Sequence, residues 1–370
     1  MSRSSNIRVL MTTDAVGGVW TYSCGLASDL AKAGVDVTLV TLGPRARTDE
    51  RDRLHRSRVR LIETDLALEW QDPEGRNVAD ASRVLAGLEA RLRPDVVHLN
   101  SFREASFGWD APTVLVAHSC VNSWARACRD TAWLEEPRWR RYTERVAAAL
   151  EEAQAWVCPS RAFHDVISEL YRPRSRGTVI WNGIAPGDVV GRKQDVILAA
   201  GRLWDRAKNI EALAAAAHGL SWPAEVAGNA DASLPLSVRW LGQLPREAMH
   251  ARLRQAAIFV SPALYEPFGL AVLEAAAAGC ALVLSDIPTF RELWDGAATF
   301  IDPSDADALH RALAGLCADA RERSRLQRAA YEHSLTYSQA RMTSAYLKLY
   351  ESLLTSRPAK ATEDQVEVRA

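Results

Sequence analysis

Residues 7–41 read IRVLMTTDAVGGVWTYSCGLASDLAKAGVDVTLVT, and this stretch decides the fold class. It begins with a short apolar and β-branched run, Ile7–Thr12, and closes with a second one, Val35–Thr41, as two buried strands would. Between them, Val19–Lys32 repeats its apolar residues at helical spacing after a glycine turn at Gly17–Gly18. Strand, helix and strand together predict a βαβ unit with parallel strands.

The same alternation continues through the chain. Further strands are predicted at Val59–Glu63, Val96–Leu99, Thr113–His118, Ala155–Pro159, Thr178–Trp181, Val196–Ala200, Ala224–Ala227, Val238–Leu241, Ile258–Ser261, Ala281–Ser285 and Ala298–Ile301. Helices are predicted at Glu136–Glu152, Arg161–Leu170, Ile210–His218, Arg246–Gln255, Ala271–Ala278, Ala306–Ala318, Ala320–His333 and Ser338–Leu354. Apolar strands that alternate with helices predict parallel sheets covered on both faces.

A break in the pattern divides the chain in two. Residues 185–193 hold two glycines and a proline without periodicity, which predicts an interdomain linker. The fold class is therefore α/β, with Rossmann-like doubly wound domains at residues 1–184 and 194–337 that face each other across a cleft. The polar tail, residues 357–370, is expected to be disordered.

Composition narrows the classes of function. The 370 residues suit two domains, and 48% hydrophobic with 25% charged residues is globular. A net charge of −1 argues against a nucleic-acid partner. The six cysteines form no CxxC pair, the N-terminus does not resemble a signal peptide, and no apolar run is long enough to span a bilayer. A cytoplasmic protein is expected.

The chemical signal lies at residues 262–279, PALYEPFGLAVLEAAAAG. A predicted strand ends just before it, and a predicted helix begins near Leu270. Gly269 allows a ligand to approach the backbone, and the free N–H groups at a helix start suit a phosphate. Glu274 lies one turn further, where its carboxylate can accept hydrogen bonds from paired hydroxyls. The alternative is an ordinary strand–helix turn with a solvated Glu266, and spacing alone does not decide between them.

This segment resembles the EX7E motif of retaining glycosyltransferases of family 4, which have the GT-B fold. Other segments are similar to further motifs of that family, in the same order along the chain: Gly17-Gly18-Val19-Trp20, Asn182-Gly183-Ile184, Gly201-Arg202-Leu203 with Lys208-Asn209, and Val238 to Gly242. The resemblance runs from Ile7 to about Leu354. It implies that the C-terminal helix, within residues 338–356, crosses back to pack on the N-terminal domain.

The resemblance implies a role for each cation and carboxylate. Arg202 and Lys208 would neutralise the diphosphate of a nucleotide-sugar donor, and their places after a strand end and at a helix start suit one shared anion. Their other interpretation is as solvated surface charges. Glu274 would bind the ribose hydroxyls, and Glu266 would lie near the transferred sugar.

Backbone groups complete the implied donor site. Those of Phe268, Gly269 and Leu270 would hold sugar hydroxyls. Gly17 and Gly18 would close over the phosphates, or else form an ordinary βα turn. Gly242 ends the strand near the base, and Leu244 would meet the base through its backbone.

His118, at the end of a predicted strand, resembles a family histidine that lies near the reacting sugar. It is a candidate catalytic residue that contacts sugar hydroxyls or shapes the acceptor site, and the alternative is a histidine satisfied within a loop. His98 lies in another recurrent family segment, but Asn100 stands where many members have a second histidine. That departure removes support for an acceptor role of this strand.

No metal or other cofactor is expected. Asp305-Ala306-Asp307 spells the DXD signature of metal-dependent glycosyltransferases, but it stands at a predicted helix start. Asp is a favoured residue at the N-cap and in the first helical turn, so helix capping is the preferred interpretation.

A basic and aromatic patch surrounds Arg138-Trp139-Arg140-Arg141, with Trp124 and Trp133 nearby. This composition suits a weak peripheral contact with the inner face of a membrane. Nearby glutamates dilute the charge, so a solvated helix face with arginine stems on apolar neighbours is preferred.

The sequence therefore predicts a retaining, metal-independent glycosyltransferase. It would transfer a hexose-type sugar from a UDP- or GDP-sugar to a glycan, a lipid-linked acceptor or a small molecule. The alternatives are a GT-B-fold nucleotide-sugar epimerase or hydrolase, and a non-catalytic nucleotide-sugar sensor. The base, the sugar, the acceptor, the linkage and the oligomeric state stay open.

Overall fold

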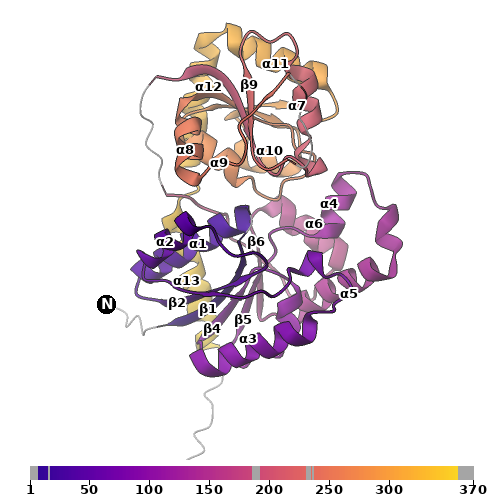
Figure 1. The fold of residues 1–370 in the computed structure, drawn as a ribbon, viewed down its shortest axis with the longest axis vertical. Coiled ribbons are helices and arrows are strands. Elements are labelled where there is room, and N and C mark those ends of the chain that lie inside the picture. Colours follow the sequence, from indigo (N-terminus) through magenta and orange to yellow (C-terminus); the bar gives the residue numbers. More distant parts are fainter. Residues whose placement is uncertain (1–6, 16, 186–191, 231–234, 236, 357–370) are drawn as a thin grey trace, which may run out of the picture.

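Two parallel sheets, each flanked by helices, make up the computed structural model, which describes residues 7–15, 17–185, 192–230, 235 and 237–356 (Figure 1). The first sheet has the order β3-β2-β1-β4-β5-β6-β7, with strands at Arg8–Asp14 (β1), Asp36–Leu42 (β2), Arg60–Glu63 (β3), Val96–Leu99 (β4), Thr113–Val116 (β5), Ala155–Cys158 (β6) and Thr178–Val179 (β7). The second has the order β10-β9-β8-β11-β12-β13, with strands at Gln194–Ala200 (β8), Ala224–Ala227 (β9), Arg239–Trp240 (β10), Ala256–Ser261 (β11), Ala281–Ser285 (β12) and Ala298–Ile301 (β13).

Strand order places one switch point in each sheet. β1 pairs in parallel with β2 on one side and with β4 on the other. β8 lies in the same way between β9 and β11. Ligands of doubly wound sheets bind beyond the carboxyl ends of the strands at such points. The loops that follow β1 and β8 are therefore the places where a site is expected.

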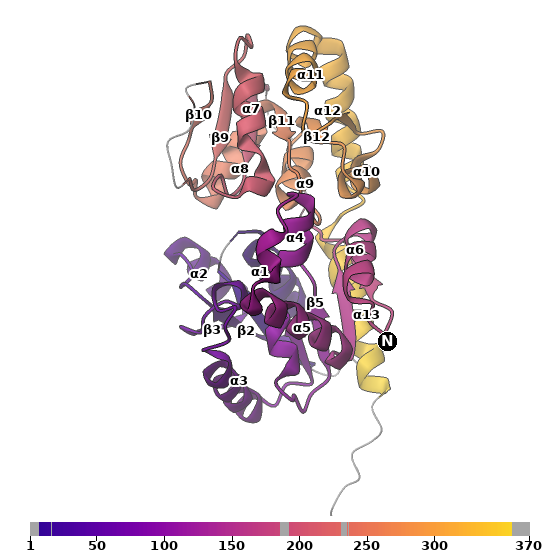
Figure 2. The same ribbon diagram turned by 90° about the vertical axis from the view of Figure 1, so that its right-hand side faces the viewer.

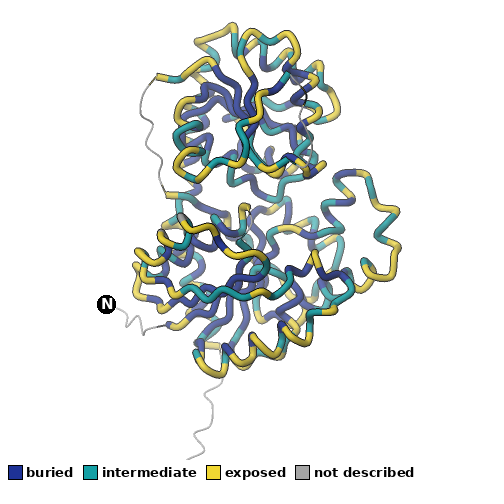
Figure 3. The backbone as a smooth tube through the Cα atoms, in the orientation of Figure 1, coloured by how far each residue is buried: buried dark blue, intermediate teal, exposed yellow. Residues whose placement is uncertain are grey.

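Each sheet buries both of its faces, because successive strand residues point in opposite directions. Met11 packs with one helix layer and Leu10 with the other. The first layer holds α1 (Gly18–Lys32), α2 (Thr48–His55) and α13 (Gln339–Thr355), and the second holds α3 (Val78–Leu92), α5 (Pro137–Glu152) and α6 (Arg161–Tyr171). Figure 3 shows the buried strands inside both domains.

The second sheet is covered in the same manner. Its helices are α7 (Ile210–Ala217) and α11 (Ala306–Ala318) on one face, and α8 (Arg246–Gln255), α9 (Leu270–Ala277), α10 (Pro288–Trp294) and α12 (Ala320–Ser334) on the other. A short helix, α4 (Val121–Ala127), lies where the domains meet (Figure 2). Single 3-10 turns complete the elements at Glu69–Gln71, Arg103–Ser106, Ala132–Glu135 and Arg206–Lys208.

α13 confirms the expected return of the chain to the N-terminal domain. Its Met342, Tyr346 and Tyr350 are buried in the core around α1 and the first sheet. Where the chain passes between the domains, Ile184 and Ser338 form an isolated parallel bridge. The predicted linker falls largely on residues 186–191 and the predicted disordered tail on residues 357–370, and both lie outside the described residues.

The prediction that β5 extends to His118 is wrong. Ala117 still donates its N–H to Val157 O at 2.8 Å, but β6 then ends at Cys158. Pro159, which follows, has no N–H to continue the ladder. His118 therefore lies in a loop two residues beyond β5. Four helices were also not predicted: α2, α3, α4 and α10.

Candidate active site

The loop between β11 and α9 is held by Gly269, the N-cap of α9. Its φ of 90° is a left-handed conformation that favours glycine. A Cβ at this position would lie 3.1 Å from Phe290 Cε1 and 3.3 Å from Glu266 Cγ. Phe268, the preceding residue, is buried in the second domain. The α9 backbone thus begins, at Leu270, directly beside the Glu266 side chain.

Glu266 forms an ion pair with Lys208. Lys208 Nζ donates to Glu266 Oε2 at 2.6 Å, and the two side chains are 20% and 18% exposed, so each can still be reached by a ligand. The Lys208 stem lies on Gly201, where a Cβ would be 3.4 Å away. The loops after β8 and β11 therefore bring together two residues that are 58 positions apart.

Arg202 lies in the first of these loops and pairs with Asp205. An Arg202 Nη donates to Asp205 Oδ2 at 3.0 Å, and the guanidinium lies 5.5 Å from the Trp204 ring. Its side chain is 46% exposed, whereas that of Asp205 is 5% exposed. One edge of the guanidinium is thus held while much of the group stays accessible.

Glu274 faces α8. Its Oε1 lies 3.6 Å from an Arg246 Nη and 3.7 Å from His250 Nε2, and its side chain is 17% exposed. The nearby Gly242 has φ 72° and accepts a hydrogen bond from the N–H of Gly228. Arg246 and His250 were not predicted. The sequence signal that could have indicated them is that they follow the Gly242 segment and are four residues apart, which places them on one face of a helix.

Leu244 lines an open hollow of about 390 Å³ along α8 and the β9–β10 edge. Its other walls include Leu241, Arg239 and the buried Glu225. Glu225 is paired with both Arg239 and Arg252. Leu244 therefore belongs to this flank of the second sheet as well as to the loop that follows Gly242.

Gly17 and Gly18, from the first domain, lie near the start of α9 in the second domain. Gly17 is the N-cap of α1 with φ 70°, and its Cβ position is open. A Cβ on Gly18 would lie 3.7 Å from Leu270 Cδ1. The amino ends of α1 and α9, one from each domain, thus approach each other, and both carry the positive end of a helix dipole.

His118 is held by Asn100. Asn100 Nδ2 donates to Thr12 O at 2.7 Å, so its Oδ1 is the acceptor that faces His118 Nε2 at 2.7 Å. His118 Nε2 therefore carries the proton and Nδ1 is left as the acceptor. Burial against Tyr22, whose ring lies 4.6 Å away, lowers the pKa of His118 to about 3. The ring is neutral at physiological pH.

His98 is fully buried in β4. Its Nδ1 lies 2.6 Å from Tyr350 Oη of α13, and its Nε2 lies 3.3 Å from Tyr22 Oη of α1. Burial lowers the pKa of His98 to about 3. This histidine ties the C-terminal helix to the first sheet, away from solvent.

A second buried network follows β3 and β4. Arg103 donates to Glu104 Oε1 at 2.6 Å and lies 3.6 Å from Asp72, and all three residues are buried. Glu69, also buried, accepts the N–H of Phe102 at 3.1 Å. Burial, and then the nearby Glu104, raise the pKa of Glu69 to about 8. No signal in the sequence pointed to this network, because its members form no known motif.

Several contacts join the domains around the site. The Trp124 indole donates to Asp205 at 2.8 Å, and Tyr265 Oη lies 2.7 Å from Ser123 Oγ. Glu292 of α10 accepts the N–H groups of residues 161 and 162 at the start of α6. None of these contacts was predicted, since each depends on how the two domains meet.

The DXD-like segment caps a helix, as predicted. Asp305 is the N-cap of α11, and its Oδ1 accepts the N–H of Ala308 at 2.7 Å. Within the part of the chain that the structure describes, no group of three or more His, Cys, Asp or Glu residues is arranged to hold a metal ion.

The basic and aromatic patch makes internal contacts. Arg138 pairs with Glu136 and Arg140 with Glu135, each at 2.8 Å. The Trp133 ring lies 5.0 Å from that of Trp139. No helix among the described residues is both long and apolar enough to cross a membrane.

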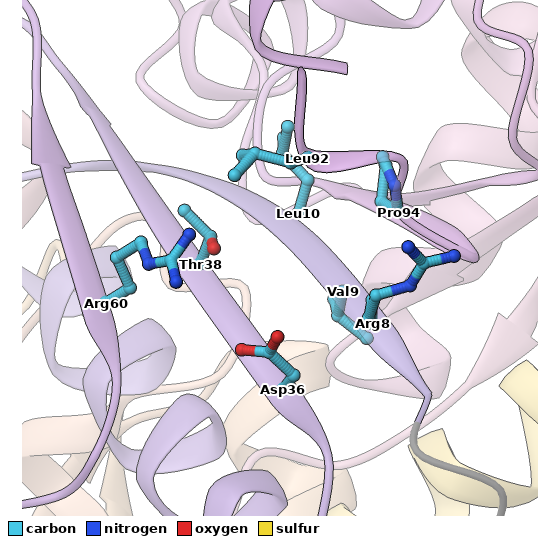
Figure 4. A pocket seen from close by; sticks show the side chains of 8 residues that line it. All are labelled: Arg8, Val9, Leu10, Asp36, Thr38, Arg60, Leu92 and Pro94. Carbon is cyan, nitrogen blue, oxygen red and sulfur yellow. The ribbon is translucent and has the colours of Figure 1, made fainter. Parts of the chain in front are cut away.

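A small hollow of about 40 Å³ lies at the amino ends of β1, β2 and β3, where its lining includes Arg8, Asp36 and Arg60 (Figure 4). The predicted site residues do not line it. It is therefore at the opposite edge of the first sheet from the candidate site.

Two family models match consecutive parts of the chain. The model described as "Glycosyltransferase Family 4" matches residues 16–187, and that described as "Glycosyl transferases group 1" matches residues 191–333. Two doubly wound domains that meet at glycine-led helix starts give this chain the GT-B fold. The two family models show that it is a glycosyltransferase of this fold class. Within that class, the chain belongs to the family 4 type that these two models describe in this order.

Curated relatives resemble parts of the chain. Glycogen synthase from Mycobacterium tuberculosis is 29% identical over 230 residues, which are 54% of this chain and 54% of that protein. Phosphatidyl-myo-inositol mannosyltransferase from Mycolicibacterium smegmatis is 34% identical over 119 residues, 31% of each chain. The chain thus spans about half, or less, of the length of these relatives.

Solved structures share the whole fold. Sucrose-phosphate synthase from Thermosynechococcus elongatus has a TM-score of 0.79 at 19% identity, covering 95% of this chain and 100% of that chain. Anabaena Alr3699/HepE in complex with UDP-glucose has a TM-score of 0.70 at 15% identity, covering 94% and 100%. At these identities the likeness shows the fold.

Proposed function

We propose that this protein is a retaining, metal-independent glycosyltransferase. It moves a hexose-type sugar from a UDP- or GDP-sugar to a glycan, a lipid-linked acceptor or a small molecule. The observation that carries the proposal is the approach of Gly18 to Leu270, which joins two helix amino ends from different domains. Lys208 pairs with Glu266 next to Gly269, and Arg202 lies in the same loop as Lys208, so these cations and the helix ends would together make a cradle for a diphosphate. The Anabaena protein bound to UDP-glucose supports a nucleotide-sugar donor.

The reaction breaks the bond between the sugar and the diphosphate and leaves both electrons on the phosphate oxygen. Arg202, Lys208 and the N–H groups that open α1 and α9 stabilise that developing charge. Lys208 then exchanges Glu266, its partner at 2.6 Å, for the diphosphate. These groups supply the positive charge that a metal ion supplies in other glycosyltransferases, which is the ground for proposing a metal-independent site.

The acceptor proton passes to a donor phosphate oxygen as the new glycosidic bond forms on the same face of the sugar. His118 positions the transferred sugar. Its Nε2–H is held by Asn100, so its neutral Nδ1 can accept a hydrogen bond from a sugar hydroxyl. Glu274, which is flanked by Arg246 and His250, accepts hydrogen bonds from the ribose hydroxyls. None of the six cysteines, which all lie within the described residues, is in a disulfide, and five of them are buried, as suits the reducing cytoplasm.

A thermal-shift screen of UDP, GDP, ADP, TDP and their common sugars, with and without EDTA, tests the proposal. A nucleotide at 100 times its Kd should add about 2.7 kcal/mol of stability. We expect one base to give a shift that survives EDTA and disappears in the Arg202→Ala, Glu274→Ala double variant. A shift that requires a divalent metal would overturn metal independence, and no shift with any nucleotide would overturn the donor site.

Retention is tested on the product. Once the screen has fixed the donor, NMR of the transferred sugar's anomeric centre gives its configuration. The same anomer as in the donor is expected, and the opposite anomer would contradict a retaining reaction.

A further inference from the structure

We propose that the indole N–H of Trp124 positions Arg202 for the donor diphosphate. Trp124 belongs to α4 of the N-terminal domain and acts through Asp205 of the C-terminal domain. The inference rests on the proposed function, because it takes Arg202 as a ligand of the diphosphate. Trp124 is a positioning residue, since it touches neither the donor nor the reacting atoms.

Asp205 connects the two side chains. Its Oδ1 accepts the Trp124 Nε1–H at 2.8 Å and the backbone N–H of Ala207 at 3.0 Å. Its Oδ2 accepts from an Arg202 Nη at 3.0 Å. Because the Asp205 side chain is only 5% exposed, water cannot readily replace a lost donor. The orientation of the carboxylate is therefore set by both neighbours together.

The consequence falls on Arg202. Its guanidinium is planar, so fixing one edge against Asp205 fixes the direction of the other edge. The side chain is 46% exposed, which leaves that other edge accessible to an anion. Without the Trp124 bond, Ala207 N–H alone holds Oδ1 of Asp205, so the carboxylate is less firmly oriented and the direction of Arg202 is less well fixed.

α4 also touches the second donor loop. Ser123 Oγ lies 2.7 Å from Tyr265 Oη, and Tyr265 directly precedes Glu266, the partner of Lys208. Both cation-bearing pairs of the donor site are thus supported from one short helix of the opposite domain. The donor cations are in place only while α4 is docked, so donor binding is linked to the contact between the domains.

The same tryptophan also packs on Trp133, with ring centroids 6.3 Å apart. Simple apolar packing is therefore the competing explanation of Trp124. Trp133 provides the matched control, because it belongs to the same aromatic row on the α4 side of the interface.

The test measures Kd for UDP and GDP by calorimetry in Trp124→Phe and Trp133→Phe, each in the wild-type and the Arg202→Ala backgrounds. Phe keeps the apolar ring and removes the N–H. We expect Trp124→Phe to weaken binding about 10-fold in the wild-type background and less than about twofold when Arg202 is already absent. Trp133→Phe should change Kd less than about twofold in either background.

Equal weakening in both backgrounds, or a Trp124→Phe that behaves like Trp133→Phe, would overturn the relay. Should Trp124→Phe lower the melting temperature strongly, Asp205→Asn takes its place. In that variant the amide oxygen can still accept the hydrogen bond from Trp124, but the amide nitrogen cannot accept one from Arg202. The same loss of nucleotide affinity is therefore expected. Wild-type protein that binds neither nucleotide would overturn the donor site and the relay together. Normal wild-type binding that Arg202→Ala weakens, with no effect of Trp124→Phe or Asp205→Asn, would overturn the relay alone.

Discussion

The loops after β8 and β11 of the C-terminal domain hold charged pairs that solvent reaches in part, whereas several titratable groups of the N-terminal domain lie in buried networks. Arg202, Lys208 and Glu266 retain partly exposed side chains, and only Asp205, the partner of Arg202, is buried. His98, in contrast, is fully buried between elements far apart in the chain. The difference indicates that substitutions in the first set should alter catalysis, and substitutions in the second should alter folding.

The sharpest test of this contrast is Lys208→Ala. If Lys208 stabilises the developing charge on the diphosphate, as proposed, its removal should lower kcat by about 100-fold to 1000-fold. Stability should change by less than about 1 kcal/mol, because ion pairs that solvent can reach contribute little. Nucleotide release from the donor and a melting curve measure the two effects. Lys32→Ala, at a 74% exposed side chain, is the control. A variant that loses stability but keeps its turnover would break the contrast.

The opposite pattern is expected for Tyr350→Phe. The change removes only the hydroxyl that lies 2.6 Å from His98 Nδ1 and leaves that nitrogen without its partner in the core. Stability should fall by about 2 kcal/mol, with kcat unchanged within twofold. Urea unfolding and turnover measure both, beside Tyr331→Phe as the control. If Tyr350→Phe is as stable as the control, the network does not hold α13 in place.

Glu69→Gln tests the buried acid. The folded pKa of about 8 lies above the ordinary value of 4.5, so the folded protein keeps a proton that the unfolded chain releases. That contribution to stability is complete below pH 4.5 and is lost as the pH rises through 8, at up to about 1.4 kcal/mol per pH unit. The substitution should flatten the pH dependence of unfolding in this range, whereas the exposed Glu152→Gln should not. Parallel curves for Glu69→Gln and wild type would contradict the raised pKa.

The smallest effect is expected for Asp305→Ala. Loss of the N-cap bond to Ala308 should cost about 1 kcal/mol of stability. Turnover should stay within twofold of wild type, both with and without EDTA. Asp307→Ala, which lies in the first turn of α11 without the capping role, should cost less. A 10-fold fall in turnover in either variant would instead favour the DXD interpretation.

The contrast between the domains also explains what the sequence could predict. The strand-end rule places Arg202, Lys208 and Glu266 together, because each follows or adjoins the carboxyl end of a strand in one sheet. The side chains of Lys208 and Glu266 meet as that rule requires. β4, β12 and α11 have the predicted bounds, since their apolar patterns are strong and local.

The missed features had two different causes. α3 carries Ala81, Leu85 and Leu88 at helical spacing, so the sequence does contain a local signal for this helix. α4 is a seven-residue helix whose contacts, such as Trp124 with Asp205, lie across a domain boundary. No local pattern encodes a contact of that kind. In the sequence, Asn100 stands out only as a departure from the family pattern, because its hydrogen bond to His118 depends on the fold.

The return of α13 to the first sheet sets a sequence of events during synthesis on the ribosome. Domains usually fold in the order in which they emerge. Here the N-terminal domain emerges first, but its core lacks Met342, Tyr346 and Tyr350 until the last helix has been translated. His98 gains its Tyr350 partner only then. The second domain can be complete before the first, so apolar residues along α1 stay uncovered until α13 has been translated.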